Sequence, residues 1–168
     1  TFGGKGNVSI PPGEWMWSDP VDLNFVHKSA AVFLEGRKLA VSFHIAGPSG
    51  PMTWHAKALQ TSYLSAPKGG VRSRDESEAA FPYTTASWIF LDALDMMAPA
   101  HTAVVACFGD SITDGTASTM NGDDRWPDVL AQRVREKYGG RVVIVNAGIG
   151  GNRVIGPADY AQNPVPGG

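Results

Sequence analysis

The chain has 168 residues, of which 43% are hydrophobic and 18% are charged, and its formal net charge is −2. This near-neutral balance gives no electrostatic reason to expect a nucleic acid or an anionic membrane as a partner. No run reaches the roughly 18 apolar residues that a helix needs to cross a bilayer, so the sequence predicts no membrane span.

Residues 1–100 predict β structure. In Leu39–Ile45, large apolar residues alternate with Ala40, Ser42 and His44. Residues 21–25 also alternate, and residues 88–91 form a short apolar run. Clusters of proline and glycine separate these runs, as turns separate strands. We therefore expect a domain that resembles a β-sandwich or jelly roll over residues 1–100.

Four tryptophans of this region keep two interpretations open. They either pack in the core of the β domain or form a platform on which sugar rings stack, and they are Trp15, Trp17, Trp54 and Trp88. Quenching of exposed tryptophans by sugars would favour the platform.

The pattern changes near residue 100, where a linker-like stretch precedes a continuous apolar run at Val104–Phe108. Such a run is typical of a parallel strand that is covered on both faces. It contains Cys107, the single cysteine, for which we expect a buried position in the strand. A single cysteine has no partner for an intrachain disulfide.

A helix is predicted from Arg125 to Tyr138. Asp123 and Asp124 lie at its start, where side-chain oxygens cap free N–H groups, and Pro127 suits its first turn. Gly139 is expected to end it.

A second apolar run, Val142–Val145, follows this helix and completes a βαβ unit. Each strand ends in a glycine-containing turn, Gly109–Ser111 after the first and Gly148–Asn152 after the second. Open α/β sheets place their sites at the carboxyl ends of the strands, so we expect these two turns to build one site.

Ser111 is the candidate nucleophile of that site. A serine directly after a buried strand is held at the end of the sheet with its hydroxyl exposed, and Asp110 can fix the turn by accepting hydrogen bonds from nearby N–H groups. The glycines of the second turn leave N–H groups uncovered, and two N–H groups that converge near a nucleophile make an oxyanion hole. The alternatives are a plain turn serine and a phosphate-binding loop, although the glycine spacing does not suit the latter.

Two stretches carry a resemblance to a known family. Phe108–Gly115 resembles the first sequence block of the GDSL, or SGNH, hydrolases, and Asn146–Asn152 resembles their second block. The resemblance implies that Ser111 is the nucleophile and that its N–H and that of Gly151 help to form the oxyanion hole. It also implies a flavodoxin-like α/β/α fold for the domain at residues 101–168, and ester hydrolysis without a metal or cofactor.

Residues 1–101 more loosely resemble the β-rich N-terminal region of a bacterial subgroup of this family. Many members of that subgroup are exported, which implies a secreted or extracytoplasmic protein by analogy. Thr1–Gly4 shows neither an initiator methionine nor a signal sequence, so we expect the natural start to lie further upstream.

The later family blocks, which supply an oxyanion asparagine and the catalytic Asp and His, are not found in this sequence. A serine hydroxyl needs such a base at neutral pH. We therefore expect a cut in the loop around residues 157–168, with a complementary C-terminal chain of the same protein that supplies these groups.

The histidines of the chain itself are expected to be ordinary surface or hydrogen-bonded residues. His101 enters the first strand at the end opposite Ser111, and about 30 Å of strand separates the two. His27 and His44 lie in the β region. His55 could approach the site from that region, and this alternative stays open.

Residues beside the two turns also keep two interpretations. Asn152 and Arg153 could contact a substrate or support the second turn, and Asp114 could bond across the first turn or face solvent. The sequence as a whole favours hydrolysis of a carboxylic ester, in a small molecule or an acylated carbohydrate, through an acyl-serine intermediate. The alternative is a non-catalytic fragment, either a carbohydrate- or partner-binding β region or a pseudo-enzyme.

Overall fold

The computed structural model describes residues 1–24 and 36–155. By its internal contacts the chain divides into two units, Thr1–Val41 and a second unit that begins at Ser42. The domain boundary near residue 100 and the sandwich-like and flavodoxin-like arrangements stay predictions.

Asp19 organises the described part of the first unit. Its carboxylate accepts hydrogen bonds from the backbone N–H groups of Gly3 (2.7 Å) and Gly4 (2.9 Å) and from the Thr1 hydroxyl. These bonds, with that from Thr1 the strongest contribution, lower the pKa of the Asp19 carboxyl. The strand predicted at residues 21–25 does not form at residues 21–24, and residue 25 lies outside the described residues.

The strands in the described part of the second unit pair two by two. The antiparallel pairs are β1 (Trp54–His55) with β4 (Trp88–Ile89) and β2 (Ser62–Leu64) with β3 (Tyr83–Thr85), and the parallel pair is β5 (Ala103–Gly109) with β6 (Val142–Gly148). A 3-10 helix, η1 (Glu78–Ala80), precedes β3. The apolar run predicted as a strand at residues 88–91 therefore forms a strand, β4, only over its first two residues.

Leu39–Ile45 forms no strand, so this prediction was wrong. A strand needs a second strand to pair its backbone N–H and C=O groups, and this stretch has no such partner among the described residues. Its apolar side chains are 46–48% exposed: Leu39, Val41, Phe43 and Ile45.

The four tryptophans do not form a core. The exposed fraction of their side chains is 40% for Trp88, 49% for Trp54, 50% for Trp17 and 66% for Trp15. The core interpretation was therefore wrong, since none of the four side chains is buried. A sugar-stacking platform stays a hypothesis.

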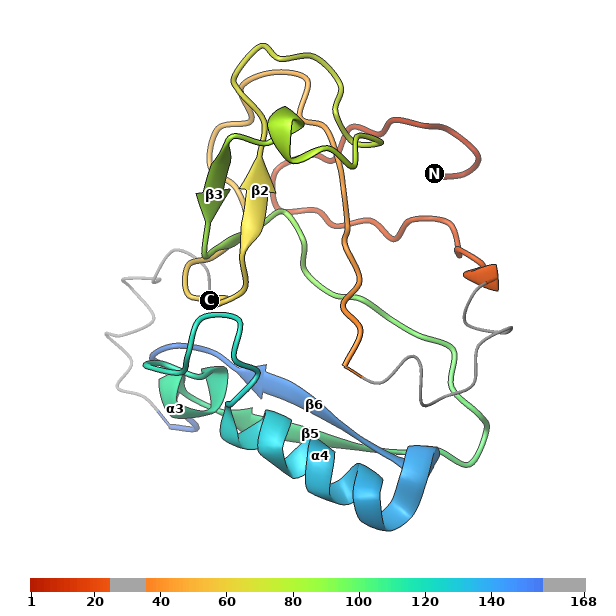
Figure 1. Cartoon of the computed structure of the whole chain (residues 1–168), viewed down its shortest axis with the longest axis vertical. Helices are drawn as coiled ribbons and strands as arrows, with labels where there is room; N and C mark the ends of the chain where they lie inside the picture. Colours follow the sequence, from red (N-terminus) through yellow and green to blue (C-terminus); the bar gives the residue numbers. More distant parts are fainter. Residues whose placement is uncertain (25–35, 156–168) are drawn as a thin grey trace. The chain divides into compact units, whose positions relative to one another are not determined.

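β5 and β6 form the parallel pair that the sequence predicted. Their register runs from Ala103 opposite Val142 to Gly109 opposite Gly148. Both strands therefore end at the same edge of the sheet, and the turns that follow them start side by side (Figure 1).

The helix α4 (Trp126–Tyr138) connects these strands and packs against β6 (Figure 1). Arg125 is its N-cap, and Asp128 accepts a hydrogen bond from the Arg125 backbone N–H at 3.1 Å. Pro127 lies in the first turn, and Gly139, with φ +63°, ends the helix, as predicted. A short 3-10 helix, η2 (Gly139–Arg141), leads into β6.

Asp123 and Asp124 do not cap α4, so that prediction was wrong. Asp124 accepts hydrogen bonds from the backbone N–H (3.0 Å) and hydroxyl (2.6 Å) of Thr119, and Asp123 accepts one from Gln60 Nε2. Donors outside the helix thus occupy the two carboxylates.

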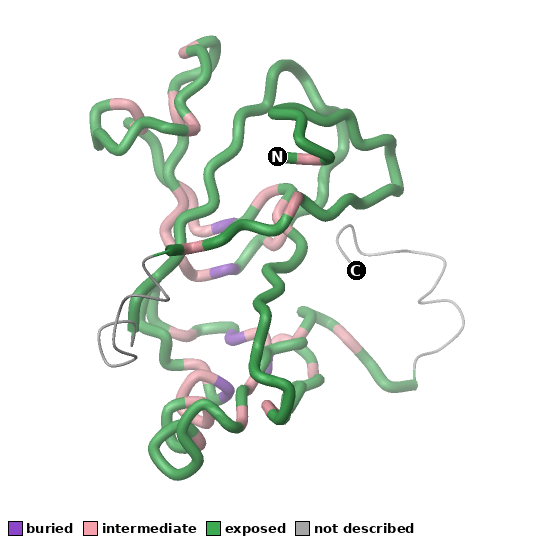
Figure 2. Tube along the Cα trace, turned by 90° about the vertical axis from the view of Figure 1, so that its right-hand side faces the viewer, coloured by how far each residue is buried: buried purple, intermediate pink, exposed green. Residues whose placement is uncertain are grey.

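β5 is not covered on both faces in the described structure. Val104 is 62% and Phe108 64% exposed, whereas Cys107 is 5% exposed, as expected for that cysteine. Two strands and one helix cannot enclose both faces of a sheet, which explains the difference. Ala58 and Thr113 are among the buried residues. Figure 2 shows how little of the described chain is buried.

Candidate active site

Ser111 begins α3 (Ser111–Asp114), a single helical turn directly after β5 (Figure 1). Asp110 is its N-cap residue and accepts a hydrogen bond from the Ile112 backbone N–H at 2.9 Å through Oδ1. The hydrogen bond that the sequence predicted for Asp110 is therefore present. It fixes the backbone immediately before and after Ser111.

The hydroxyl and the backbone N–H of Ser111 donate no hydrogen bond among the described residues. The residue itself is half-buried. The first N–H groups of a helix have no partner within that helix, which leaves that of Ser111 available to a ligand.

The close packing of α3 on β6 depends on Gly148. A Cβ at Gly148 would run into the backbone of Thr113 and Asp114. The side chain of Asn146 reinforces this contact, because its Nδ2 donates to the Thr113 carbonyl at 2.7 Å and its Oδ1 accepts from the Gly148 N–H at 2.9 Å. Asn146 thus ties the Ser111 turn to the end of β6.

The second turn is attached to the first through the carbonyl of Gly109. This oxygen accepts hydrogen bonds from the Ile149 N–H at 3.0 Å and from Asn152 Nδ2 at 3.3 Å. Asn152 thus joins the two turns, and contact of its side chain with a substrate stays a prediction. Gly151 is exposed with φ +78°, a conformation that favours glycine, and its N–H donates no hydrogen bond within the described residues.

His55 reaches α3 from the β region. Its Nε2 lies 2.8 Å from Asp114 Oδ1, and the Asp114 side chain is only 12% exposed. The Asp114 side chain therefore bonds to another segment and does not face solvent, while its backbone N–H bonds across the turn to the Asp110 carbonyl at 2.9 Å. Of the other histidines, His44 and His101 are exposed, and His27 lies outside the described residues.

Residues 107–166 match the model of the GDSL-like lipase/acylhydrolase family. The match spans both turns and supports the GDSL/SGNH family for this part of the chain. It also supports, at a coarse level, a hydrolase that acts on esters. No curated protein matches the chain.

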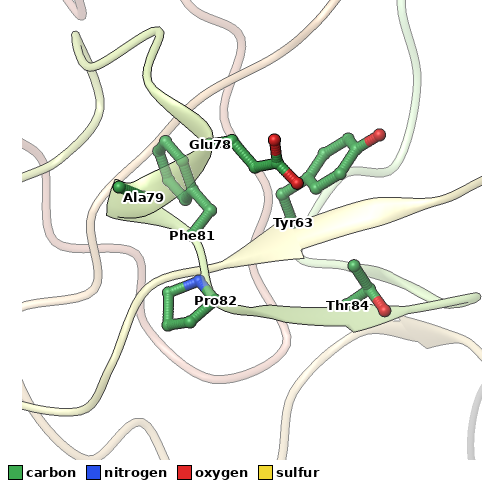
Figure 3. A pocket seen from close by; sticks show the side chains of 6 residues that line it. All are labelled: Tyr63, Glu78, Ala79, Phe81, Pro82 and Thr84. Atoms are coloured by element: carbon green, nitrogen blue, oxygen red, sulfur yellow. The ribbon is translucent and has the colours of Figure 1, made fainter.

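The part of the chain that matches the family model, residues 107–166, is called the GDSL-like segment below. A pocket of about 290 Å³ lies in this segment, where β5 and the second turn meet. Its lining includes Asp110 and Asn152 but neither Ser111 nor Gly151, and consists of Phe108, Gly109, Asp110, Thr113, Asn152, Arg153 and Val154. A second pocket, of about 470 Å³, is lined by residues of β2, η1 and β3 and their neighbours: Tyr63, Glu78, Ala79, Phe81, Pro82 and Thr84 (Figure 3).

Residues 1–24 and 36–155 contain neither a candidate metal centre nor a helix suited to cross a membrane. No three His, Cys, Asp or Glu side chains are placed together so that they could hold a metal ion. None of the helices combines the length and the apolar character that crossing a bilayer would require.

The sequence did not single out Asn146 or the partnership of His55 with Asp114. The signal for Asn146 was an amide side chain at the end of an otherwise apolar strand, directly before the second turn. For His55 and Asp114 no local signal exists, because 59 positions of the sequence separate them, and only the folded chain brings them together.

Proposed function

We propose that this chain hydrolyses carboxylic esters through an acyl-serine intermediate at Ser111. The observation that carries the proposal is the position of Ser111 inside the GDSL-like segment. It lies at the carboxyl edge of a parallel sheet, with its hydroxyl and N–H unused by the described residues. Small-molecule esters and acylated carbohydrates are the substrate classes that we propose.

In the proposed reaction, Ser111 Oγ attacks the ester carbonyl carbon while a base takes the hydroxyl proton. The tetrahedral intermediate expels the alcohol, which receives that proton, and leaves an acyl group on Ser111. Water, activated by the same base, then hydrolyses the acyl-serine and restores the hydroxyl.

The backbone N–H groups of Ser111 and Gly151 are the proposed donors to the oxyanion. Each such donor lowers the transition-state energy by about 3 kcal/mol when it is already oriented. Asp110 and Asn152 act as supporting residues, since they hold the two turns that carry these donors.

The base is proposed to be a histidine, oriented by an aspartate, on a complementary C-terminal chain of the same protein. Two features support this. The Ser111 hydroxyl has no histidine partner among the described residues, and Val104 and Phe108 expose apolar surface on the sheet that helices packed on its faces would cover.

The test is intact mass under denaturing conditions, before and after treatment with a fluorophosphonate probe. One adduct on the 17.8 kDa chain, absent in Ser111→Ala, supports the proposal. A second polypeptide in the same sample identifies the source of the base. If the chain stays unlabelled even when every co-purifying polypeptide is present during the treatment, the proposal is contradicted.

One observation favours a second candidate function, carbohydrate binding by the β region. The pocket in Figure 3 combines the ring of Tyr63, which is 63% exposed, with the carboxylate of Glu78. Exposed aromatic rings stack on the apolar faces of sugars, and carboxylates accept hydrogen bonds from their hydroxyls. Oligosaccharide binding that is lost in Tyr63→Ala and retained in Ser111→Ala would establish this function.

A further inference from the structure

The turn that carries Ser111 cannot fix its own orientation. α3 has four residues, and a helix of that length is not stable by itself in water, because nucleation costs more than one turn of hydrogen bonds returns. The direction of the Ser111 side chain must therefore be set by what holds this turn from outside.

Arg125 holds the carboxyl end of α3. Its Nε donates to the Asp114 carbonyl at 2.7 Å, and a second guanidinium nitrogen donates to the carbonyl of Ala58. The Arg125 side chain is 11% exposed, and Gly115, with φ +110°, leaves the space in which it lies. One buried side chain thus connects α3 to the segment after β1.

His55 holds the side chain of the same residue. Asp114 follows Ser111 by three positions, so the two lie on the same face of the helical turn. His55 itself is kept in place by the pairing of β1 with β4, where it lies opposite Trp88, and by an edge-on contact of the two rings with 5.9 Å between their centroids.

The loop after α3 is joined to the same segment by reciprocal hydrogen bonds. The backbone N–H of Asn121 donates to the Leu59 carbonyl at 2.9 Å, and the Asn121 side chain accepts from the Thr61 N–H and donates to the Thr61 hydroxyl, each at 2.8 Å. Asn121 and Leu59 both have left-handed backbone angles, with φ +59° and +54°. Such angles persist where surrounding contacts enforce them.

From these contacts we infer that His55–Thr61, a segment of the β region, is a positioning element of the active site. His55 acts as a positioning residue that orients Ser111 through Asp114, and it takes no proton from Ser111. This inference rests on the proposed function, since it assigns the β region a role in the reaction at Ser111.

The test measures kcat and KM for p-nitrophenyl acetate in the active protein, with any complementary chain that co-purifies. His55→Ala is expected to lower kcat by about 10- to 100-fold, as small misplacements of a nucleophile do, and to leave KM within about threefold. His55→Gln, whose amide can still donate to Asp114, recovers most of kcat. His101→Ala, at an exposed histidine, is the control and matches the wild type.

Two results would overturn the inference: a kcat for His55→Ala equal to that of His101→Ala, or a loss as complete as in Ser111→Ala that His55→Gln does not rescue. The second result would mean that His55 itself transfers the proton. If His55→Ala does not fold, Thr61→Val tests the inference instead, because it removes the hydroxyl that accepts a hydrogen bond from Asn121. A lower kcat in Thr61→Val supports the inference, and an unchanged kcat overturns it. A wild type without Ser111 labelling would contradict the proposed function instead.

Discussion

The two turns at the carboxyl edge of the β5–β6 pair are held to very different degrees. Three sets of contacts fix the Ser111 turn. Asp110 caps it from within, and Asn146 bonds to it from β6. Arg125 and His55 both bond to Asp114 at its end, and His55 belongs to the β region. The second turn, beyond Gly148, is attached mainly through one acceptor, the Gly109 carbonyl. The comparison indicates that the described contacts hold Ser111, the proposed nucleophile, more firmly than Gly151, the proposed second donor.

Gly148→Ala should produce the largest effect, because it adds a Cβ where the backbone of α3 already lies. We expect the free energy of unfolding to fall by about 2–3 kcal/mol, the range for overpacking at a tight contact. Urea denaturation measures this. Gly140→Ala is the matched control, since nothing lies within 4 Å of the added Cβ there. Equal stabilities for the two variants would show that α3 does not pack on β6 as described.

Asn146→Ala should have the next largest effect, since it removes the bond that joins the Ser111 turn to β6 at the Thr113 carbonyl and the bond to the Gly148 N–H within β6. The loss leaves a carbonyl and an N–H without partners and is expected to cost about 2 kcal/mol. Asn146→Asp keeps the acceptor for Gly148 but loses the donor to Thr113, so it should also destabilise the fold. If Asn146→Ala unfolds with the same free energy as the wild type, the Ser111 turn is not held more firmly than the second turn.

Asn152→Ala should cost less, about 1 kcal/mol or below, because the bond it removes is longer, at 3.3 Å, and Gly109 keeps the bond from Ile149. Hydrogen exchange should report faster opening of the second turn, while the amides of α3 are unaffected. A larger destabilisation than that of Asn146→Ala would reverse the order of the two turns.

Much of the segment from residue 103 to residue 148 could be predicted because its signals are local. The apolar runs of β5 and β6, the position of Pro127 and the glycine after α4 each act within a few residues. The alternation at Leu39–Ile45 predicted a strand that does not form, since alternation shows which residues share a face but not whether a partner strand exists.

The contacts that hold the candidate site could not be read in the same way. The sequence around Asp123 predicted a helix cap. In the structure the Asp123 carboxylate instead accepts a hydrogen bond from the side chain of Gln60, 63 positions away. The pairing of His55 with Asp114 likewise depends on the folded chain. Sequence therefore located Ser111 and the second turn, and only the structure shows what orients them.

Thr119→Val should have the smallest effect, on the loop between α3 and α4. The Thr119 hydroxyl, followed by its N–H, lowers the pKa of the Asp124 carboxyl, so removing the hydroxyl should raise that pKa toward its ordinary value of 3.8. Because folding lowers this pKa, the carboxylate stabilises the fold above pH 3.8, and the contribution is lost as the pH falls through the folded-state pKa. An NMR titration of Asp124 in both proteins measures the change, and identical curves would exclude the hydroxyl as its cause.

The most direct test of the central claim is to trap the intermediate itself. The protein is acid-quenched during turnover of p-nitrophenyl acetate, and the digested chain is analysed by mass spectrometry. We predict one acetyl group on the peptide that contains Ser111, absent in Ser111→Ala. Ester turnover with no acylated peptide, or with the acetyl group on another residue, would contradict an acyl-serine mechanism at Ser111.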